Sequence, residues 1–290
     1  MASHGMGASI GIGRHSVIPM TDVMVARAPR LYIDSVTTIP LPPRSVAMRP
    51  LALPAEHGGW GFLFEPIALG LLVAPSWCGA LVAAAAVSAF LARHPLKLAM
   101  QDALRRRSYP RTRYCRWFAG LYALAGALAL ASGVALGGAQ VLLPLAIVAP
   151  LAAVQLVYDA RNRSRELLPE LTGALAMSSI AAAVAIAGGF ALIPALGIAG
   201  IIAARTLPSV LYVRGLLRHG PAWPVVAIHG LALLAVVWFA SPFATAAMAM
   251  LLIRAVWGLT HEPPRAQTVG WREIAYGAVT VALIAIGYGV

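Results

Sequence analysis

The chain has 290 residues, of which 60% are hydrophobic and 11% are charged, and its formal net charge is +12. A soluble domain carries about 25% charged residues, so much of the surface of this protein must face lipid. The composition excludes a secreted disulfide scaffold, a collagen-like or disordered chain, and a soluble nucleic-acid-binding domain.

The first part of the chain differs in composition from the rest. Residues 1–47 are rich in Gly, Ser and Pro with scattered Arg, and they contain no apolar stripe long enough to pack. A signal peptide needs a continuous apolar core, and the region 18–33 is too interrupted to provide one. We therefore expect a disordered basic leader, with Met48 as an alternative start of translation.

Residues 48–290 are expected to form one all-α transmembrane domain. Crossing the hydrocarbon core takes about 20 helical residues, and helices satisfy their own backbone hydrogen bonds in lipid. Small or turn-forming residues separate successive apolar stretches. The sequence thus predicts a polytopic bundle of nine transmembrane helices at 55–74, 76–93, 115–135, 139–158, 170–187, 190–211, 223–240, 242–260 and 271–290.

Basic residues alternate between the predicted connections. All 22 Lys and Arg fall before the first predicted span or around every second connection, which leaves none for the other four turns. Because basic residues beside membrane segments stay in the cytoplasm, we expect the N-terminus inside and the C-terminus outside. The positive charge then reflects topology and attraction to anionic membrane lipids, and no nucleic-acid partner is expected.

Cysteine and metal-ligand patterns add little. Cys78 and Cys115 are predicted at opposite ends of their spans, too far apart for a disulfide. The sequence contains no metal-binding motif, so no metal and no other cofactor are expected.

Glu65 is the most unusual ionisable residue because it lies in the middle of the first predicted span, beside Pro66. A charge at that depth is costly and usually faces a cavity or a partner. Arg205 and Arg254, each about two turns inside the membrane boundary, are the bases nearest in depth. We expect Glu65 to pair with one of them, either for structural reasons alone or as part of a site.

Three further clusters of polar residues lie at the predicted cytoplasmic edge. One contains His57 and two glycines, and another, 93–97, is expected to end the second helix at Pro95. In 158–170, carboxylates alternate with bases, which favours an ion-pair network or a polyanion site over a plain loop. We hypothesise one cytoplasm-facing basic cavity whose candidate ligand-binding residues are His57, Glu65, His94, Lys97, Tyr158, Asp159, Arg161, Arg163, Arg205, Tyr212, Arg214 and Arg254.

These motifs resemble a known family. Residues 53–66, 93–97 and 158–167 are similar to the YwiC-like family of bacterial integral membrane proteins, and the resemblance extends over residues 51–290. The resemblance implies a multi-pass protein of a bacterial cytoplasmic (inner) membrane, and it implies no mechanism.

A more distant resemblance is to the UbiA-type intramembrane prenyltransferases, through residues 61–66 and through Tyr158 followed by basic residues. It implies nine helices, an N-terminus inside, and a prenyl diphosphate held through Mg²⁺ by two aspartate-rich motifs. Of the corresponding stretches, 93–102 contains one aspartate and 209–218 contains no aspartate. Mg²⁺ needs several oxygen ligands, so metal-dependent transfer is not expected.

Three functions remain open at this point. The leading hypothesis is a UbiA-like bundle whose arginines hold an anionic lipid or isoprenoid headgroup directly, with His57, Glu65 or Asp159 available as an acid or base. The alternative is a small-molecule or lipid transporter in which Glu65 and Arg254 couple transport, although the sequence has no clear internal repeat. The third is a structural partner of another membrane protein, favoured by alanine-rich faces such as 83–86.

Overall fold

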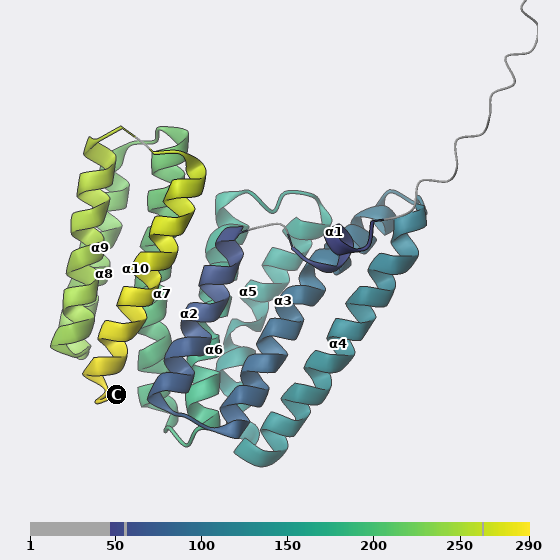
Figure 1. The fold of residues 1–290 in the computed structure, drawn as a ribbon, viewed down its shortest axis with the longest axis horizontal. Coiled ribbons are helices and arrows are strands. Elements are labelled where there is room, and N and C mark those ends of the chain that lie inside the picture. The colour runs from purple at the N-terminus through teal and green to yellow at the C-terminus, as the bar shows by residue number, and fades with distance from the viewer. Residues whose placement is uncertain (1–46, 55–56, 263) are drawn as a thin grey trace, which may run out of the picture. The chain divides into compact units, whose positions relative to one another are not determined.

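A computed structural model describes residues 47–54, 57–262 and 264–290. Within these ranges the chain is helical and contains no strand, so the all-α prediction is confirmed there. The predicted leader lies outside the described residues except for residue 47. The elements are α1 (Arg49–Ala52), α2 (His57–Val73), α3 (Trp77–Leu104), α4 (Pro110–Gly137), η1 (Ala139–Val141), α5 (Leu142–Ala160), α6 (Leu167–Ala187), α7 (Leu192–Arg218), α8 (Ala222–Phe239), α9 (Pro242–Thr260) and α10 (Ala266–Gly287) (Figure 1).

Eight of the described helical segments are long and apolar enough to cross a membrane: α3, α4, η1 with α5, and α6 to α10. This set is what a multi-pass membrane protein requires. The remaining long helix, α2, has 17 residues, or about 25 Å at 1.5 Å per residue. That length is at the lower limit of a membrane span, so the count of nine depends on α2.

Several helices continue beyond the predicted spans, and the extensions longer than two residues all lie at the charged end. The clearest difference is α3, which was expected to end near residue 93 and instead continues through Pro95 to Leu104. Hydrophobicity marks the part of a helix that lies in hydrocarbon, whereas the backbone hydrogen bonds continue into polar sequence. The prediction that Pro95 ends the helix is therefore wrong, and Arg93 and Lys97, four residues apart, share one face of α3.

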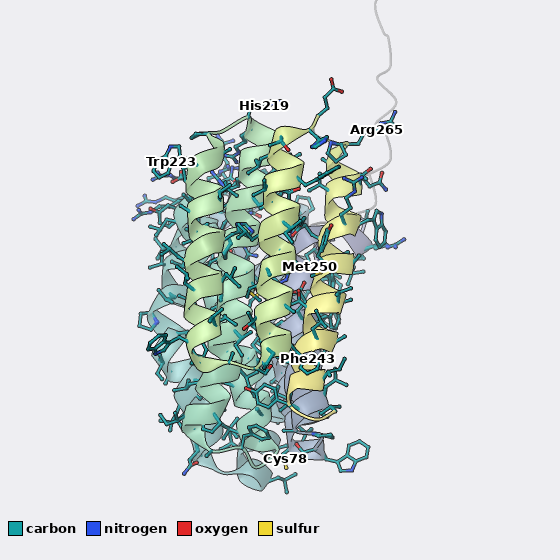
Figure 2. All side chains as sticks on the ribbon, turned by 90° about the vertical axis from the view of Figure 1, so that its left-hand side faces the viewer. Cys78, His219, Trp223, Phe243, Met250 and Arg265 are labelled. Atoms are coloured by element: carbon teal, nitrogen blue, oxygen red, sulfur yellow. The ribbon has the colours of Figure 1, made fainter. Side chains whose placement is uncertain are left out.

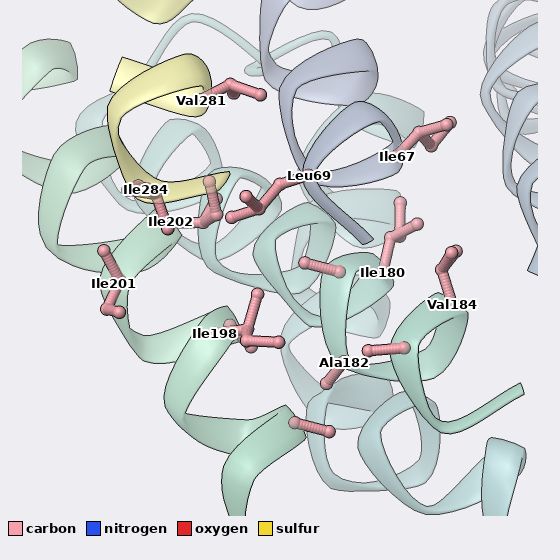
Figure 3. Close-up of a cluster of buried hydrophobic side chains, with 14 of the residues drawn as sticks. Ile67, Leu69, Ile180, Ala182, Val184, Ile198, Ile201, Ile202, Val281 and Ile284 are labelled. Carbon is pink, nitrogen blue, oxygen red and sulfur yellow. The ribbon is translucent and has the colours of Figure 1, made fainter. Parts of the chain in front are cut away.

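The apolar core is centred on α6, which packs against α2, α3, α5 and α7. Five consecutive residues of this helix, 181–185, are fully buried. A Cβ atom at Gly70 would lie 2.8 Å from Cβ of Val184, so glycine allows α2 to approach α6 closely. Figure 3 shows this contact region, where side chains of α2, α6, α7 and α10 meet.

The two ends of the helices differ in charge. The connections at 74–76, 138, 188–191 and 240–241 contain no charged residue, whereas those at 105–109, 161–166 and 261–265 are basic or mixed. In Figure 2, His219 and Arg265 lie at one end and Cys78 at the other. The charged side chains discussed below therefore belong to one end of the bundle or to its interior.

Candidate functional site

An ion pair joins α2 to α7 inside the bundle. Arg205 Nη2 lies 2.9 Å from Glu65 Oε1, and the two residues are 1% and 8% exposed. Gly277 of α10 makes room for this pair, because a Cβ atom there would overlap Glu65 Oε1 and would lie 2.8 Å from Arg205 Nη2. Three helices thus meet around a buried charge of each sign.

The pair extends into a longer network through α10. Arg205 Nη2 donates a hydrogen bond of 3.0 Å to the backbone carbonyl of Glu273, and the Glu273 carboxylate pairs with Arg254 of α9. We call Glu65, Arg205, Glu273 and Arg254 the charge network. It contains two acids and two bases from four helices, so its charges balance when all are ionised.

Arg254 has its own polar and aromatic surroundings. Its Nη2 lies 3.1 Å from His229 Nε2 and 3.4 Å from Ser209 Oγ, and its guanidinium carbon lies 4.1 Å from the ring centroid of Tyr212. His229 Nδ1 lies 2.7 Å from the Val225 carbonyl. A neutral His229 that donates from Nδ1 and accepts at Nε2 satisfies both contacts.

These contacts decide between the two bases proposed for Glu65. The structure pairs Glu65 with Arg205, and Arg254 pairs instead with Glu273. The expectation that one of the two arginines pairs with Glu65 is therefore confirmed. The two arginines have similar predicted depths in the membrane, so depth alone does not show which of them pairs with Glu65. The packing of the helices decides it.

Four atoms of the charge network have no hydrogen-bond partner among the described residues. They are Oε2 of Glu65, Oε2 of Glu273, Nε of Arg205 and Nε of Arg254, all of them buried. Leaving a buried polar atom unsatisfied costs about 1–3 kcal/mol. The network therefore retains hydrogen-bonding capacity that the described side chains do not use.

A cavity of about 990 Å³ adjoins the network. Its walls come from α2, α3, α5, α6, α7, α10 and the α5–α6 connection. Five arginines and three glutamates line it, which gives a charge of +2 when all are ionised (5 − 3): Glu65, Arg93, Arg165, Glu170, Arg205, Arg214, Arg218 and Glu273. The apolar part of the wall includes Trp60, Phe62, Met177, Val210, Leu217, Trp271 and Ile274.

Ion pairs organise the charged end of this cavity. Arg214 Nη1 lies 2.6 Å from Glu170 Oε2 and 3.1 Å from the Arg165 carbonyl. Arg93 donates hydrogen bonds to both carboxylate oxygens of Asp159, at 2.7 and 3.1 Å. The connection between α5 and α6 is thus attached to α7, while α5 itself is attached to α3.

The predicted site residues divide into five groups. Glu65, Arg205 and Arg214 line the large cavity, whereas Tyr212 and Arg254 do not line it and contact each other. His94 and Lys97 line a separate cavity of about 20 Å³, together with Arg93. Four further members line neither cavity: Tyr158, Asp159, Arg161 and Arg163. The side chain of His57 lies outside the described part of the structure.

The single shared chamber predicted for Glu65, His57, His94, Arg205 and Arg254 is therefore only partly correct. Glu65 and Arg205 share the cavity, but His94 instead contacts the Pro50 carbonyl at 3.0 Å. Arg163 is exposed and pairs with Glu166 three residues later. Asp159 at the end of α5 is engaged by Arg93 of α3, and these two helices pack against each other.

Sequence reasoning missed Glu273, which links the two buried arginines. The signal was present in α10, where Glu273, Tyr276, Gly277 and Thr280 follow at helical spacing and define one polar, small-residue face. His229 was also missed, since a single histidine in an apolar helix has no partner visible in the sequence. Among the described residues, no group of three or more His, Cys, Asp or Glu could hold a metal ion.

Residues 53–185 match the model of the YwiC-like protein family. This segment is therefore YwiC-like, as its motifs predict. It includes Glu65 and the α5–α6 connection, whereas Arg205, Arg254 and Glu273 lie beyond it. No curated protein and no solved structure matches the chain, so the likeness to UbiA-type enzymes stays a prediction.

Proposed function

We propose that this protein is a nine-span inner-membrane protein, N-terminus inside and C-terminus outside, whose cavity binds the phosphate-bearing headgroup of an anionic lipid or isoprenoid. The proposal includes a UbiA-like arrangement of the helices. The concentration of arginine at one end of the helices supports the orientation. Arginine and not a metal ion would neutralise the phosphate, because its planar guanidinium binds phosphate oxygens in pairs.

The observation that carries the proposal is the two-part lining of the large cavity. Its charged part contains five arginines against three glutamates, and its other part is apolar and aromatic. A volume of about 990 Å³ lies at the upper end of the range of about 300–1,000 Å³ for small-molecule sites. An amphiphile with one anionic end and one hydrocarbon end matches both parts of this wall.

Arg214 is the best residue with which to test headgroup binding. It lines the cavity and is partly exposed, so its replacement leaves the buried charge network intact. Loss of a charged hydrogen bond costs about 1.5–3 kcal/mol, which corresponds to about a tenfold to hundredfold weaker affinity. We expect Arg214→Gln to weaken binding by that factor.

The measurement uses the purified protein in phosphatidylcholine nanodiscs. Dioctanoyl phosphatidylglycerol and farnesyl phosphate are titrated separately, so that the two arms distinguish a lipid from an isoprenoid source, and farnesol serves as the uncharged control. Arg163→Gln is the matched variant, because Arg163 is an exposed arginine that does not line the cavity. Equal affinities of the Arg214 and Arg163 variants, or equal binding of farnesol, would contradict the proposal.

The charge network favours transport as a second candidate. Two acids and two bases buried in four helices are an expensive arrangement, and they adjoin the cavity in which a substrate would bind. Transport would move a bound amphiphile or small anion across the membrane. Reconstituted vesicles separate the two functions, because a binding protein leaves a fluorescent phosphatidylglycerol in its original leaflet and a transporter exposes it to a quencher outside.

A further inference from the structure

The Glu65–Arg205 pair differs in burial from the Glu170–Arg214 pair, whose members also line the large cavity. Arg205 is buried, whereas the four other cavity arginines are half-buried or exposed. The carboxylate contacts the guanidinium through Oε1 only, and its Oε2 has no partner among the described residues. The Glu65 carboxylate thus occupies the position beside Arg205 that an anionic ligand in the cavity would take.

A phosphate group brought to Arg205 would meet this carboxylate. Two negative groups side by side repel each other strongly where water is scarce, and such a carboxyl group can avoid the repulsion by binding a proton. A protonated carboxyl group also becomes a hydrogen-bond donor. The Oε2 atom, which accepts no hydrogen bond from the described residues, could then donate one to a phosphate oxygen.

The other charged groups around Glu65 do not take over this role. The charged groups that line the cavity with it are Arg93 of α3, Arg165 of the α5–α6 connection, Glu170 of α6, Arg205, Arg214 and Arg218 of α7, and Glu273 of α10. Each of the other two glutamates pairs with an arginine other than Arg205. Glu170 pairs with Arg214, and Glu273 pairs with Arg254. Glu170 is also partly exposed, so water screens its repulsion of a ligand.

We propose that Glu65 is a proton-binding site coupled to the ligand, so that a phosphate-bearing headgroup and one proton bind together at the Glu65–Arg205 pair. The inference rests on the proposed function and specifies its ionic requirement. One O–H bond forms on the Glu65 carboxyl group, and one bond to hydrogen breaks in the buffer acid that gives up the proton. The headgroup replaces the carboxylate as the counter-ion of Arg205.

The test measures proton uptake together with affinity. The probes are dioctanoyl phosphatidylglycerol and farnesyl methyl phosphate, which are phosphodiesters whose charge stays constant between about pH 5 and pH 8. Each is titrated by calorimetry into the protein in phosphatidylcholine nanodiscs, in two buffers of different ionisation enthalpy. We expect uptake of about one proton per ligand and an affinity that falls towards tenfold per pH unit as the pH rises.

Variants assign the proton to a residue. Glu65→Gln should abolish the uptake and make the affinity independent of pH, whereas Glu166→Gln, the same change at a glutamate outside the cavity, should keep both effects. Loss of uptake in Glu170→Gln but not in Glu65→Gln would overturn the assignment. If Glu65→Gln does not fold, the wild-type titration still decides, because binding without proton uptake also overturns the inference.

These outcomes separate the two proposals. If a probe binds without proton uptake, the inference fails and headgroup binding stands. If neither probe binds at any pH in the range, headgroup binding fails and the inference fails with it. Whichever probe binds more tightly identifies the lipid or the isoprenoid as the source of the headgroup.

Discussion

Arg205 and Arg254 each place a guanidinium group inside the bundle and share one neighbour, Glu273. Arg205 reaches the backbone carbonyl of Glu273, and Arg254 reaches its carboxylate. A buried ion pair is weak evidence for stability, because both charges lose their hydration, but removal of one partner leaves the other charge uncompensated. Loss of Arg205 would therefore leave the Glu65 carboxylate without its arginine, whereas loss of Arg254 would leave the Glu273 carboxylate without its arginine.

We predict that Arg254→Ala lowers the free energy of unfolding by about 3–5 kcal/mol, the usual cost of breaking a buried pair. The reason is the unpaired Glu273, and the Glu65–Arg205 pair should remain. Unfolding by dodecyl sulfate in mixed micelles provides the measurement. Arg163→Ala removes an exposed arginine and should leave stability unchanged, so equal losses in both variants would show that Arg254 has no special place in the bundle.

Gly277 provides a second prediction at the scale of one residue. A methyl group there would overlap the Glu65 carboxylate, so Gly277→Ala should lower the free energy of unfolding by about 1–3 kcal/mol, as overpacking does. Gly270 lies on the same helix, two turns earlier, and a Cβ atom there would meet nothing within 4 Å. Gly270→Ala should be neutral or slightly stabilising. A destabilised Gly270 variant beside an unaffected Gly277 variant would contradict the described position of the ion pair.

Among the helices, α6 has the most buried position. Its fully buried segment, 181–185, consists of four alanines and one valine, and such small residues let the surrounding helices approach closely. Apolar side chains gain little from leaving lipid for protein, so close van der Waals packing must supply much of the association energy. The contact of α6 with α2 also sets the position of Glu65, which lies on α2 five residues before Gly70.

The close approach of α2 and α6 leads to a prediction for these elements. A side chain at Gly70 would lie 2.8 Å from Val184 Cβ and 3.0 Å from the Ala181 carbonyl. Gly70→Ala should separate the helices and lower the free energy of unfolding by about 1–3 kcal/mol. The control is Gly120→Ala in α4, where a Cβ atom meets nothing within 4 Å. The measurement is unfolding by dodecyl sulfate, and the α2–α6 contact would be refuted if the Gly120 variant were the less stable one.

At the scale of the whole molecule, one charged end and one uncharged end define a direction across the membrane. Of the described connections, those at 105–109, 161–166 and 261–265 contain charged residues, and those at the opposite end contain none. In the proposed orientation the basic end lies in the cytoplasm, because basic residues beside membrane segments stay there. Four arginines of the large cavity lie near that end or in its connections, so this orientation would open the cavity to a ligand from the cytoplasm.

We predict that a C-terminal reporter that is active only in the cytoplasm will be inactive when fused after Val290. The same reporter inserted after Gly220, in the connection between α7 and α8, should be active, because three helices separate that connection from the C-terminus. This comparison controls for expression. The reverse pattern would invert the orientation, and activity at both places would show that the number of spans between them is even.

Much of the element order could be predicted from the sequence, because the signals are local. Apolar length places the helices, and small or charged residues separate them. The buried position of Glu65 follows likewise from its place in an apolar stretch. The end of α3 was predicted wrongly at Pro95, since a proline removes one hydrogen bond and a long helix can continue on both sides of it.

The pairing of charges is decided by the tertiary structure. Arg205 and Arg254 have similar depth in the sequence pattern, and only the packing of α2 against α7 places Glu65 next to Arg205. The role of Glu273 depends on α10 lying between α9 and α2, which no local pattern specifies. Hydrophobic periodicity indicates which residues face away from water. An ion pair depends on distances of a few ångströms between side chains of different helices, and a local sequence pattern does not determine these distances.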